Sequence, residues 1–204
     1  MSVGKEKNAD MMQKELVQGR RGIHTKEMIF CGVFTALIAI GAFIKIPVPV
    51  CPFTLQFLFT MMAGLLLGGK LGSLSVIVYI VLGLIGLPVF AEGGGFWYVL
   101  KPTFGYLIGF AIGAYVTGRM IEQAKKLTLA KYLLANFTGL VIVYATGMVY
   151  YFVISNYVID TPIGLWPLFL YCFLLAIPGD IALCILAAFL AKGIRTTIRR
   201  IMEA

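Results

Sequence analysis

The chain has 204 residues, of which 60% are hydrophobic and only 13% are Asp, Glu, Lys or Arg. A soluble domain carries about 25% charged residues, and disordered segments combine low hydrophobicity with high charge, so this composition excludes both classes. The net charge is +8 with a single histidine, His24, which excludes histidine-built zinc sites and most Ser–His or Cys–His catalysis. The sequence therefore predicts an all-α integral membrane protein.

Six apolar segments are candidates for membrane-spanning helices, each of which needs about 20 mostly apolar residues. A polar tail, 1–27, precedes them and a basic tail, 193–204, follows them, so we expect the membrane domain over 28–192. The last stretch is too long for one span, and Pro178 near its middle favours a new helix there, because proline fits the first turn of a helix. The expected segments are 28–46, 54–68, 71–88, 103–121, 132–154 and 165–191, the last divided into a short helix over 165–177 and a sixth span that starts at Pro178.

The basic residues predict how the chain is oriented in the membrane. Of the 17 Lys and Arg residues, 15 lie in the two tails and in the loops after the second and fourth spans, whereas the opposite side holds only Lys45 and Lys101. Cytoplasmic loops carry the excess of positive charge, so both termini are expected in the cytoplasm. This topology also accounts for the net charge, so the expected partner is the lipid bilayer and no nucleic-acid binding is indicated.

Asp180 lies inside the last apolar stretch, whereas the other acidic residues lie in tails, loops or at the ends of spans. A bare carboxylate at membrane depth costs at least about 2.5 kcal/mol, so it normally faces a partner or a cavity. Two interpretations stay open. Asp180 either caps the positive end of the helix that begins at Pro178, or it is the polar anchor of a ligand pocket in the outer half of the membrane.

Two loops on the outer side have unusual compositions. The first, 45–56, holds three prolines within six residues, which keep it extended, and it ends at Gln56, whose amide needs a partner inside a span. The second, 87–103, has three successive glycines, 93–95, followed by three aromatic residues, 96–98. This loop is interpreted either as an aromatic belt at the membrane interface or as a lid over a pocket.

Small residues repeat at helical spacing within the spans. Such faces let helices approach closely, and packing inside this chain is the favoured interpretation for the glycine series of the second to fourth spans. The small face of the first span could instead pack internally or against another subunit. The residues are Gly64, Gly68 and Gly72; Gly105, Gly109 and Gly113; and, in the first span, Cys31, Thr35 and Ala39 with Gly32 and Ala36 beside them.

No constellation in the sequence predicts chemistry. Paired carboxylates, a metal cluster and a nucleophile–base set are all missing from the sequence. The stretch 64–70 resembles a phosphate-binding loop, but Leu71 replaces the Ser or Thr that holds magnesium. We therefore expect a binding protein that neither uses a cofactor nor hydrolyses ATP by itself.

Several of these motifs resemble the BioY family, the biotin-binding S components of energy-coupling factor (ECF) transporters. The stretch that ends at Gln56, Pro-Val-Cys-Pro-Phe-Thr-Leu-Gln, is similar to the family's first-loop motif, with Cys51 as one extra residue. The other matching blocks keep their register over about 28–192. They are 68–79, 83–90, 93–95, 101–110 and the Pro-Gly-Asp triplet that ends at Asp180.

The resemblance implies a six-helix protein of the bacterial plasma membrane that binds biotin from outside and carries it across with a T component and two ATPase subunits. It implies that the small face of the first span docks on the T component, here through Cys31, Gly32, Thr35, Ala36 and Ala39. It also implies, position by position, a ligand site in which Asp180 accepts hydrogen bonds from the ureido N–H groups. The other implied ligand-binding residues are Thr54, Gln56, Tyr79, Gly94, Gly95, Trp97, Tyr98, Thr103 and Tyr106.

Two departures from that family concern the carboxylate of biotin. Leu183 stands where some relatives carry lysine, and Gly93 stands where some carry arginine. We therefore expect Lys101, one of two bases on the outer side, to take the place of the missing cation, the alternative being a solvated loop lysine. Two other functions stay open: an S component for a different small vitamin, and a membrane enzyme.

Overall fold

The computed structural model describes residues 25–46 and 53–203. Residues 1–24 of the predicted tail 1–27 and the proline-rich segment 47–52 lie outside the described residues, and residues 25–27 begin α2. Helices account for most of this part of the chain, as an apolar solvent requires, because a helix satisfies its own backbone hydrogen bonds. They are α2 (Thr25–Phe43), α3 (Gln56–Leu67), α4 (Gly69–Leu84), the 3-10 helix η1 (Phe96–Leu100), α5 (Phe104–Glu122), α6 (Leu129–Tyr157), α7 (Leu165–Phe169), the π-helical turn η2 (Leu170–Leu174) and α8 (Ile177–Glu203). A two-residue strand β1 (Lys45–Ile46) pairs antiparallel with β2 (Phe53–Thr54).

Four helical stretches are long and apolar enough to cross a membrane: Thr25–Phe43, Phe104–Glu122, Leu129–Tyr157 and the bent run Leu165–Met202. The second and third predicted segments form α3 and α4, which have 12 and 16 residues. At 1.5 Å per residue, α3 is only about 18 Å long, against about 30 Å of hydrocarbon. Each predicted segment therefore corresponds to a helix, but two of the six are short. The reason is Gly68, whose φ of 92° ends one helix and starts the next.

The bend in the last apolar stretch falls where proline predicts it. α8 begins at Ile177, so Pro178 lies in its first turn, and the preceding residues form α7 and η2. Asp180 consequently belongs to the first turn of a long helix, and its backbone N–H donates to the carbonyl of Ala176 at 3.1 Å.

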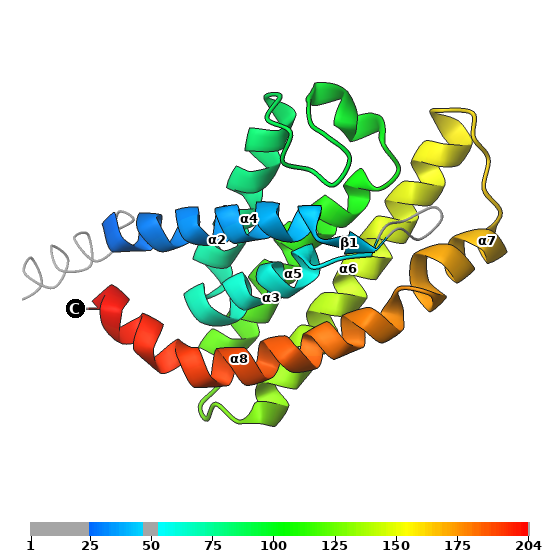
Figure 1. Ribbon diagram of the computed structural model, residues 1–204. Helices are drawn as coiled ribbons and strands as arrows, with labels where there is room; N and C mark the ends of the chain where they lie inside the picture. The colour runs from blue at the N-terminus through cyan, green and yellow to red at the C-terminus, as the bar shows by residue number, and fades with distance from the viewer. Residues whose placement is uncertain (1–24, 47–52, 204) are drawn as a thin grey trace, which may run out of the picture.

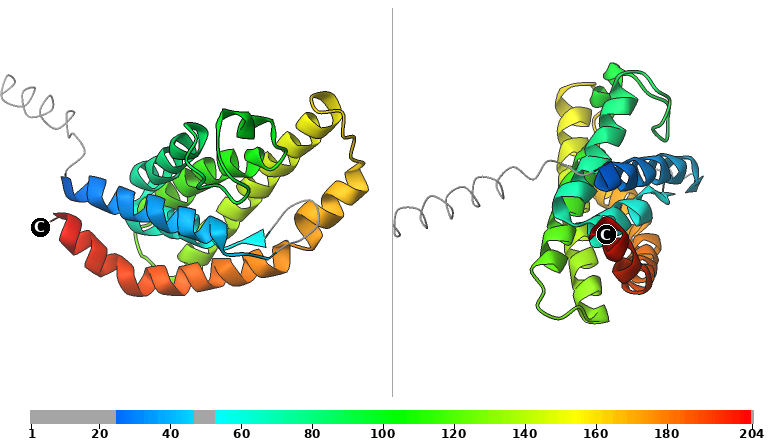
Figure 2. Two further views of the ribbon diagram at one scale, coloured as in Figure 1. Left: turned by 45° about the horizontal axis from the view of Figure 1, so that its top comes forward. Right: turned by 90° about the vertical axis from the view of Figure 1, so that its left-hand side faces the viewer.

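The helices form two layers around the short central helix α3. α4, α5 and α6 make one layer, and α2 and α8 make the second layer on the opposite side of α3 (Figures 1 and 2). α3 packs against α2, α4, α5 and α8. This arrangement buries α3 almost completely, which is why nearly every one of its side chains is apolar or small.

The connections lie at two opposite ends of the molecule. Figure 1 places the N-terminal end of α2, the C-terminal end of α8 and the α5–α6 connection toward the lower left. It places β1, the 85–103 loop and the start of α7 toward the top and right. The α3–α4 junction also lies at the first end, because the N–H of Gly69 donates to Glu122 Oε1 at 3.0 Å. Of the described Lys and Arg residues, only Lys45 and Lys101 belong to the second end.

Glycines set the close packing between layers, as their spacing predicts. A Cβ on Gly64 would lie 2.5 Å from the carbonyl oxygen of Ala114 on α5, and one on Gly109 would lie 2.9 Å from the Cα of Val143 on α6. Real Cβ atoms do not approach so closely, so these helices touch backbone to backbone. The glycine faces of α3 and α5 therefore pack inside this chain.

We expect Gly64→Ala to destabilise the protein by about 1–3 kcal/mol, because α3 and α5 must separate to admit the methyl group. Gly193, which has nothing within 4 Å of an added Cβ, is the matched control. Gly193→Ala should leave stability unchanged or raise it slightly, since alanine is the better helix former. The unfolding temperature in detergent measures both variants. Equal midpoints for the two would contradict the packing described here.

A buried arginine joins α8 to the end of α3. Arg195 donates from its guanidinium to the carbonyl of Leu65, one of the α3 carbonyls that lack a partner within the helix. On the same face of α8, the side-chain amide of Asn136 on α6 donates to the carbonyl of Cys184 at 2.8 Å. These two hydrogen bonds fix the position of α8, and with it Asp180, relative to α3 and α6.

Candidate ligand-binding site

A cavity lies between the two layers, below the second outer loop. Its lining residues surround about 710 Å³ of space, open solvent at its mouth included. β2, α3, α5, α6, α8, the turn η2 and the 85–103 loop all contribute to it. Its lining residues are Phe53, Thr54, Gln56, Phe57, Ala91, Glu92, Tyr98, Thr103, Tyr106, Leu107, Phe110, Val143, Tyr144, Cys172, Ala176 and Asp180.

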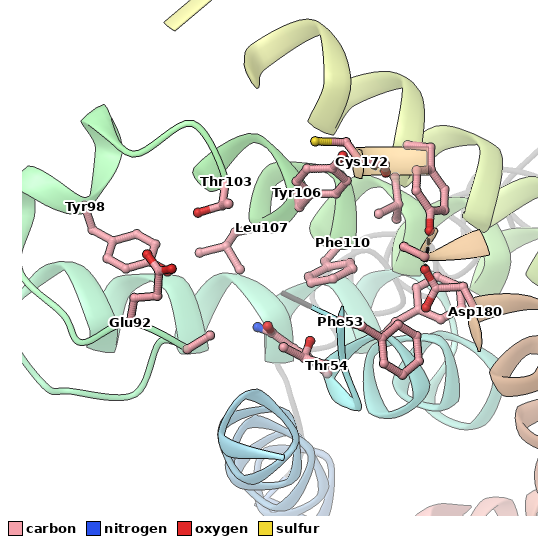
Figure 3. Close-up of a pocket in the computed structure, with 16 residues that line it drawn as sticks. Phe53, Thr54, Glu92, Tyr98, Thr103, Tyr106, Leu107, Phe110, Cys172 and Asp180 are labelled. Atoms are coloured by element: carbon pink, nitrogen blue, oxygen red, sulfur yellow. Dashed lines mark hydrogen bonds between the residues drawn. The ribbon is translucent and has the colours of Figure 1, made fainter. Parts of the chain in front are cut away.

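Asp180 marks one end of this cavity (Figure 3). Its side chain is buried, and the hydroxyl of Tyr144 on α6 donates to Oδ2 at 2.5 Å. The hydrogen bond from Tyr144 orients the carboxylate. Because a carboxylate can accept several hydrogen bonds on its two oxygens, Asp180 can still accept hydrogen bonds from a ligand. Asp180 is therefore a fixed acceptor at one end of the cavity.

Gln56 supplies the complementary group. It is the first residue of α3 and is buried. Its side chain interacts with the hydroxyl of Tyr79, but its Nε2 atom has no acceptor with full hydrogen-bond geometry among the described residues. Leaving a buried donor unsatisfied costs about 1–3 kcal/mol, which a ligand carbonyl would recover. The cavity thus combines an acceptor, Asp180, with an unused donor, Gln56.

The middle of the cavity is apolar and aromatic. Phe57 and Phe110 lie with their ring centroids 6.3 Å apart, and Tyr106 and Tyr144 meet edge to face at 6.2 Å. The hydroxyl of Tyr106 donates to the carbonyl of Cys172 at 3.3 Å, which fixes its ring against η2. Such walls suit a ligand with a polar head and a hydrophobic body.

The 85–103 loop turns one aromatic residue toward the cavity and two away from it. Tyr98 is buried, lines the cavity and packs on Phe90 at 4.4 Å. Phe96 and Trp97, in the same 3-10 helix, are 71% and 77% exposed. The lid and belt interpretations therefore apply to different residues of one segment: Tyr98 faces the cavity, and its two predecessors face the surroundings.

Charges gather at the end of the cavity opposite Asp180. Glu92 lies beside Tyr98 in Figure 3 and pairs with Lys101, whose Nζ lies 2.8 Å from Oε2. The same ammonium lies 5.0 Å from the centroid of the Tyr98 ring. Lys45 of β1 donates to the carbonyl of Ala91 at 2.8 Å. Both lysines of this end thus contact the segment 91–92.

Six of the predicted ligand-binding residues line the cavity together, although they come from five separate segments. Their convergence is a result of the fold, because they belong to three stretches that lie far apart in the sequence, 54–56, 98–106 and 180. They are Thr54, Gln56, Tyr98, Thr103, Tyr106 and Asp180.

The other five predicted ligand-binding residues, Tyr79, Gly94, Gly95, Trp97 and Lys101, are not among the lining residues. Tyr79 is fully buried behind the loop, and its hydroxyl donates to the carbonyl of Val89 at 3.0 Å. Gly94 and Gly95 bring the loop backbone onto α4, where the N–H of Gly95 donates to the carbonyl of Gly83 at 2.7 Å. Tyr79, Gly94 and Gly95 therefore hold the loop against α4. Direct contact with a ligand stays a prediction for all five residues.

Sequence reasoning missed two polar lining residues, Tyr144 and Glu92. Tyr144 lies in the middle of a 29-residue helix, far from the interfacial positions that tyrosine prefers in membrane proteins, and that location was the available signal. Glu92 precedes the three glycines and carried no signal of its own. The remaining missed residues are apolar side chains whose spacing does not distinguish a cavity wall from a core.

The small face of α2 is divided by the fold. Thr35 donates to the carbonyl of Ser75 at 2.9 Å, and Cys31 lies against Leu71, so both are buried against α4 of this chain. Gly32 and Ala36 are exposed, and Ala39 is intermediate. Internal packing therefore accounts for the first two residues, and a surface for a partner is available at the exposed pair.

Comparison with known proteins agrees with this geometry. The model of the BioY family matches residues 11–200. The chain belongs to the BioY family. The probable biotin transporter BioY of Lysinibacillus sphaericus is 46% identical over 175 residues, which is 86% of this chain and 89% of that protein. The biotin transporter BioY of Thermotoga maritima is 46% identical over 136 residues, covering 66% of this chain and 78% of that protein.

A solved structure shares the fold of this BioY chain. The crystal structure of the S-component for biotin from an ECF-type ABC transporter superposes with a TM-score of 0.72 and 29% identity. The match covers 84% of this chain and 91% of that one. The fold described above is therefore that of an ECF S component.

Proposed function

We propose that this BioY chain is the biotin-binding membrane subunit of an ATP-driven ECF importer. The observation that carries the proposal is that the buried Asp180–Tyr144 pair and the buried amide of Gln56 line the same cavity. The similarity to curated biotin transporters supports the substrate. The family is one of transporters, so the chain binds and carries its ligand without altering it.

The cavity is complementary to biotin along its length. The cyclic urea of biotin has two N–H donors beside a carbonyl acceptor, which suits the carboxylate of Asp180 and the amide donor of Gln56. The apolar rings and the valeryl chain fit walls made by Phe57, Leu107 and Phe110. The carboxylate then lies toward the opposite end of the cavity, near Lys101.

The membrane arrangement follows from the distribution of charge. Six helical segments cross or enter the bilayer, with α3 and α4 as its short members. The end with the excess of Lys and Arg is cytoplasmic, which places both termini inside and the 85–103 loop outside. The cavity then opens toward the exterior of a bacterial plasma membrane.

The energising partners are a T component and two ATPase subunits, as in the ECF class to which the structural neighbour belongs. We assign their contact to the exposed part of the small face of α2, Gly32 and Ala36 with Ala39 at its edge. A small face permits the close helix approach that association within a membrane requires. Large exposed side chains, Ile29 and Val33, lie next to it.

Uptake of labelled biotin by a biotin-auxotrophic bacterium that lacks its own transporter tests this function. Cells that express the chain together with a T component and ATPases should accumulate biotin in an energy-dependent manner. A P-loop variant of the ATPases is the control, and accumulation should fall to background there. Uptake that the control variant leaves intact would contradict the energised mechanism, and no uptake in either would contradict the transport role.

A further inference from the structure

The carboxylates at the two ends of the cavity differ in their partners. Among the described lining residues, Glu92 and Asp180 are the charged ones, and both are acids. Asp180 receives a hydrogen bond from a neutral hydroxyl, whereas Glu92 pairs with a cation that stands behind the lining. A ligand whose own carboxylate lies near Glu92 is therefore repelled by it. The repulsion is relieved if Glu92 moves away or if Lys101 pairs with the ligand as well.

Lys101 is placed to pair either with Glu92 or with the carboxylate of a bound ligand. Its ammonium lies 2.8 Å from Glu92 Oε2 and 5.0 Å from the ring centroid of Tyr98, and both of those residues line the cavity. The pair is accessible, with side-chain exposures of 40% for Lys101 and 42% for Glu92. Exposed pairs of this kind contribute at most about 1 kcal/mol, so an incoming carboxylate of similar geometry can replace Glu92 at little cost.

We propose that Glu92 is a built-in competitor for the ligand's carboxylate, and that binding of a carboxylate ligand transfers Lys101 from Glu92 to the ligand. The proposal rests on the proposed function, because it takes biotin as the ligand. Glu92 then sets how strongly the site favours the acid over a neutral analogue. The exchange breaks only the bond between Lys101 and the side chain of Glu92. Lys101 also donates to the carbonyl of Glu92 at 3.4 Å, and Lys45 keeps its bond to the carbonyl of Ala91.

The test compares the dissociation constants of biotin and of biotin amide, which has the same rings and chain without the charge. Lys101→Met should raise the dissociation constant of biotin about two- to fivefold and leave that of biotin amide unchanged. Glu92→Gln should have the opposite effect: biotin binds about two- to fivefold more tightly relative to the amide, because the competitor and its like charge are gone. The two variants therefore shift the acid-to-amide ratio in opposite directions.

Glu122→Gln is the matched control, because it removes the charge of the other described ion pair, Arg119–Glu122, at the opposite end of the molecule. It should leave the acid-to-amide ratio unchanged. If both mouth variants alter the two ligands equally, the ion pair only holds the loop and the proposal is overturned. An unchanged ratio in Glu92→Gln would also overturn it. A parent chain that binds neither biotin nor its amide would instead refute the proposed function, and the exchange with it.

Discussion

Asp180→Asn is expected to weaken biotin binding by about 10- to 100-fold, the loss typical of hydrogen bonds to a charged group. Asparagine keeps the shape of the side chain but replaces one acceptor oxygen with a donor. In one orientation of the amide that donor meets the hydroxyl of Tyr144, which donates to Asp180 Oδ2 in the parent chain. In the other orientation it meets the ureido N–H groups of biotin in the binding mode proposed above. Equilibrium binding of labelled biotin to the purified variant measures the effect.

Tyr144→Phe separates the acceptor role of Asp180 from its orientation. This variant keeps the carboxylate and the ring that packs edge to face on Phe173, and removes only the hydroxyl that donates to it. We expect a smaller loss of affinity, about fivefold. Unchanged affinity in a folded Asp180→Asn protein would mean that the acid is a helix cap rather than the ligand's acceptor.

Ala36→Trp is expected to abolish energised uptake, by at least about tenfold, while biotin binding to the isolated chain stays intact. Ala36 is exposed on α2 one turn from Gly32, and an indole there prevents another helix from approaching closely. Overpacking of this kind costs about 1–3 kcal/mol. Because α2 contributes none of the lining residues, the cavity should not change.

Ala145→Trp is the matched control, because Ala145 is an exposed alanine in the middle of α6, in the other helix layer. It should retain both uptake and binding. Loss of binding in Ala36→Trp would show that this face packs inside the chain after all. Equal loss of uptake in both variants would show that any added indole on the lipid-facing surface blocks transport, and the contact surface on α2 would have no support.

The helical segments follow from the sequence because burial in lipid imposes a single rule, continuous apolar stretches with internally satisfied backbones. Pro178 marked the bend before α8, and the glycine repeats marked the α3–α5 and α5–α6 contacts. The predicted segments 54–68 and 71–88 are a few residues longer than α3 and α4, because hydropathy does not show that Gly68 alone separates the two helices. Their burial by the surrounding helices replaces the length that a lone span would need.

The site followed from the sequence only in part. Asp180 and Gln56 were identifiable because polar groups at membrane depth need partners, whereas Tyr106 followed from the family resemblance alone. Tyr79 was placed in the site by its position in a motif, and Lys101 because it is one of two bases on the expected outer side. The fold turns Tyr79 to the loop backbone and Lys101 to Glu92. Loop residues such as Glu92 depend on tertiary contacts between β1, α4 and η1, and no local pattern encodes those contacts.

Binding of tritiated biotin to the purified, detergent-solubilised chain tests the central claim most directly, with riboflavin and thiamine as competitors. We predict tight, saturable binding to the lone chain that neither competitor displaces and that Asp180→Asn weakens. A folded parent chain that fails to bind biotin, or that binds riboflavin or thiamine instead, would contradict the account. That result would assign the cavity between Asp180 and Glu92 to a different small vitamin.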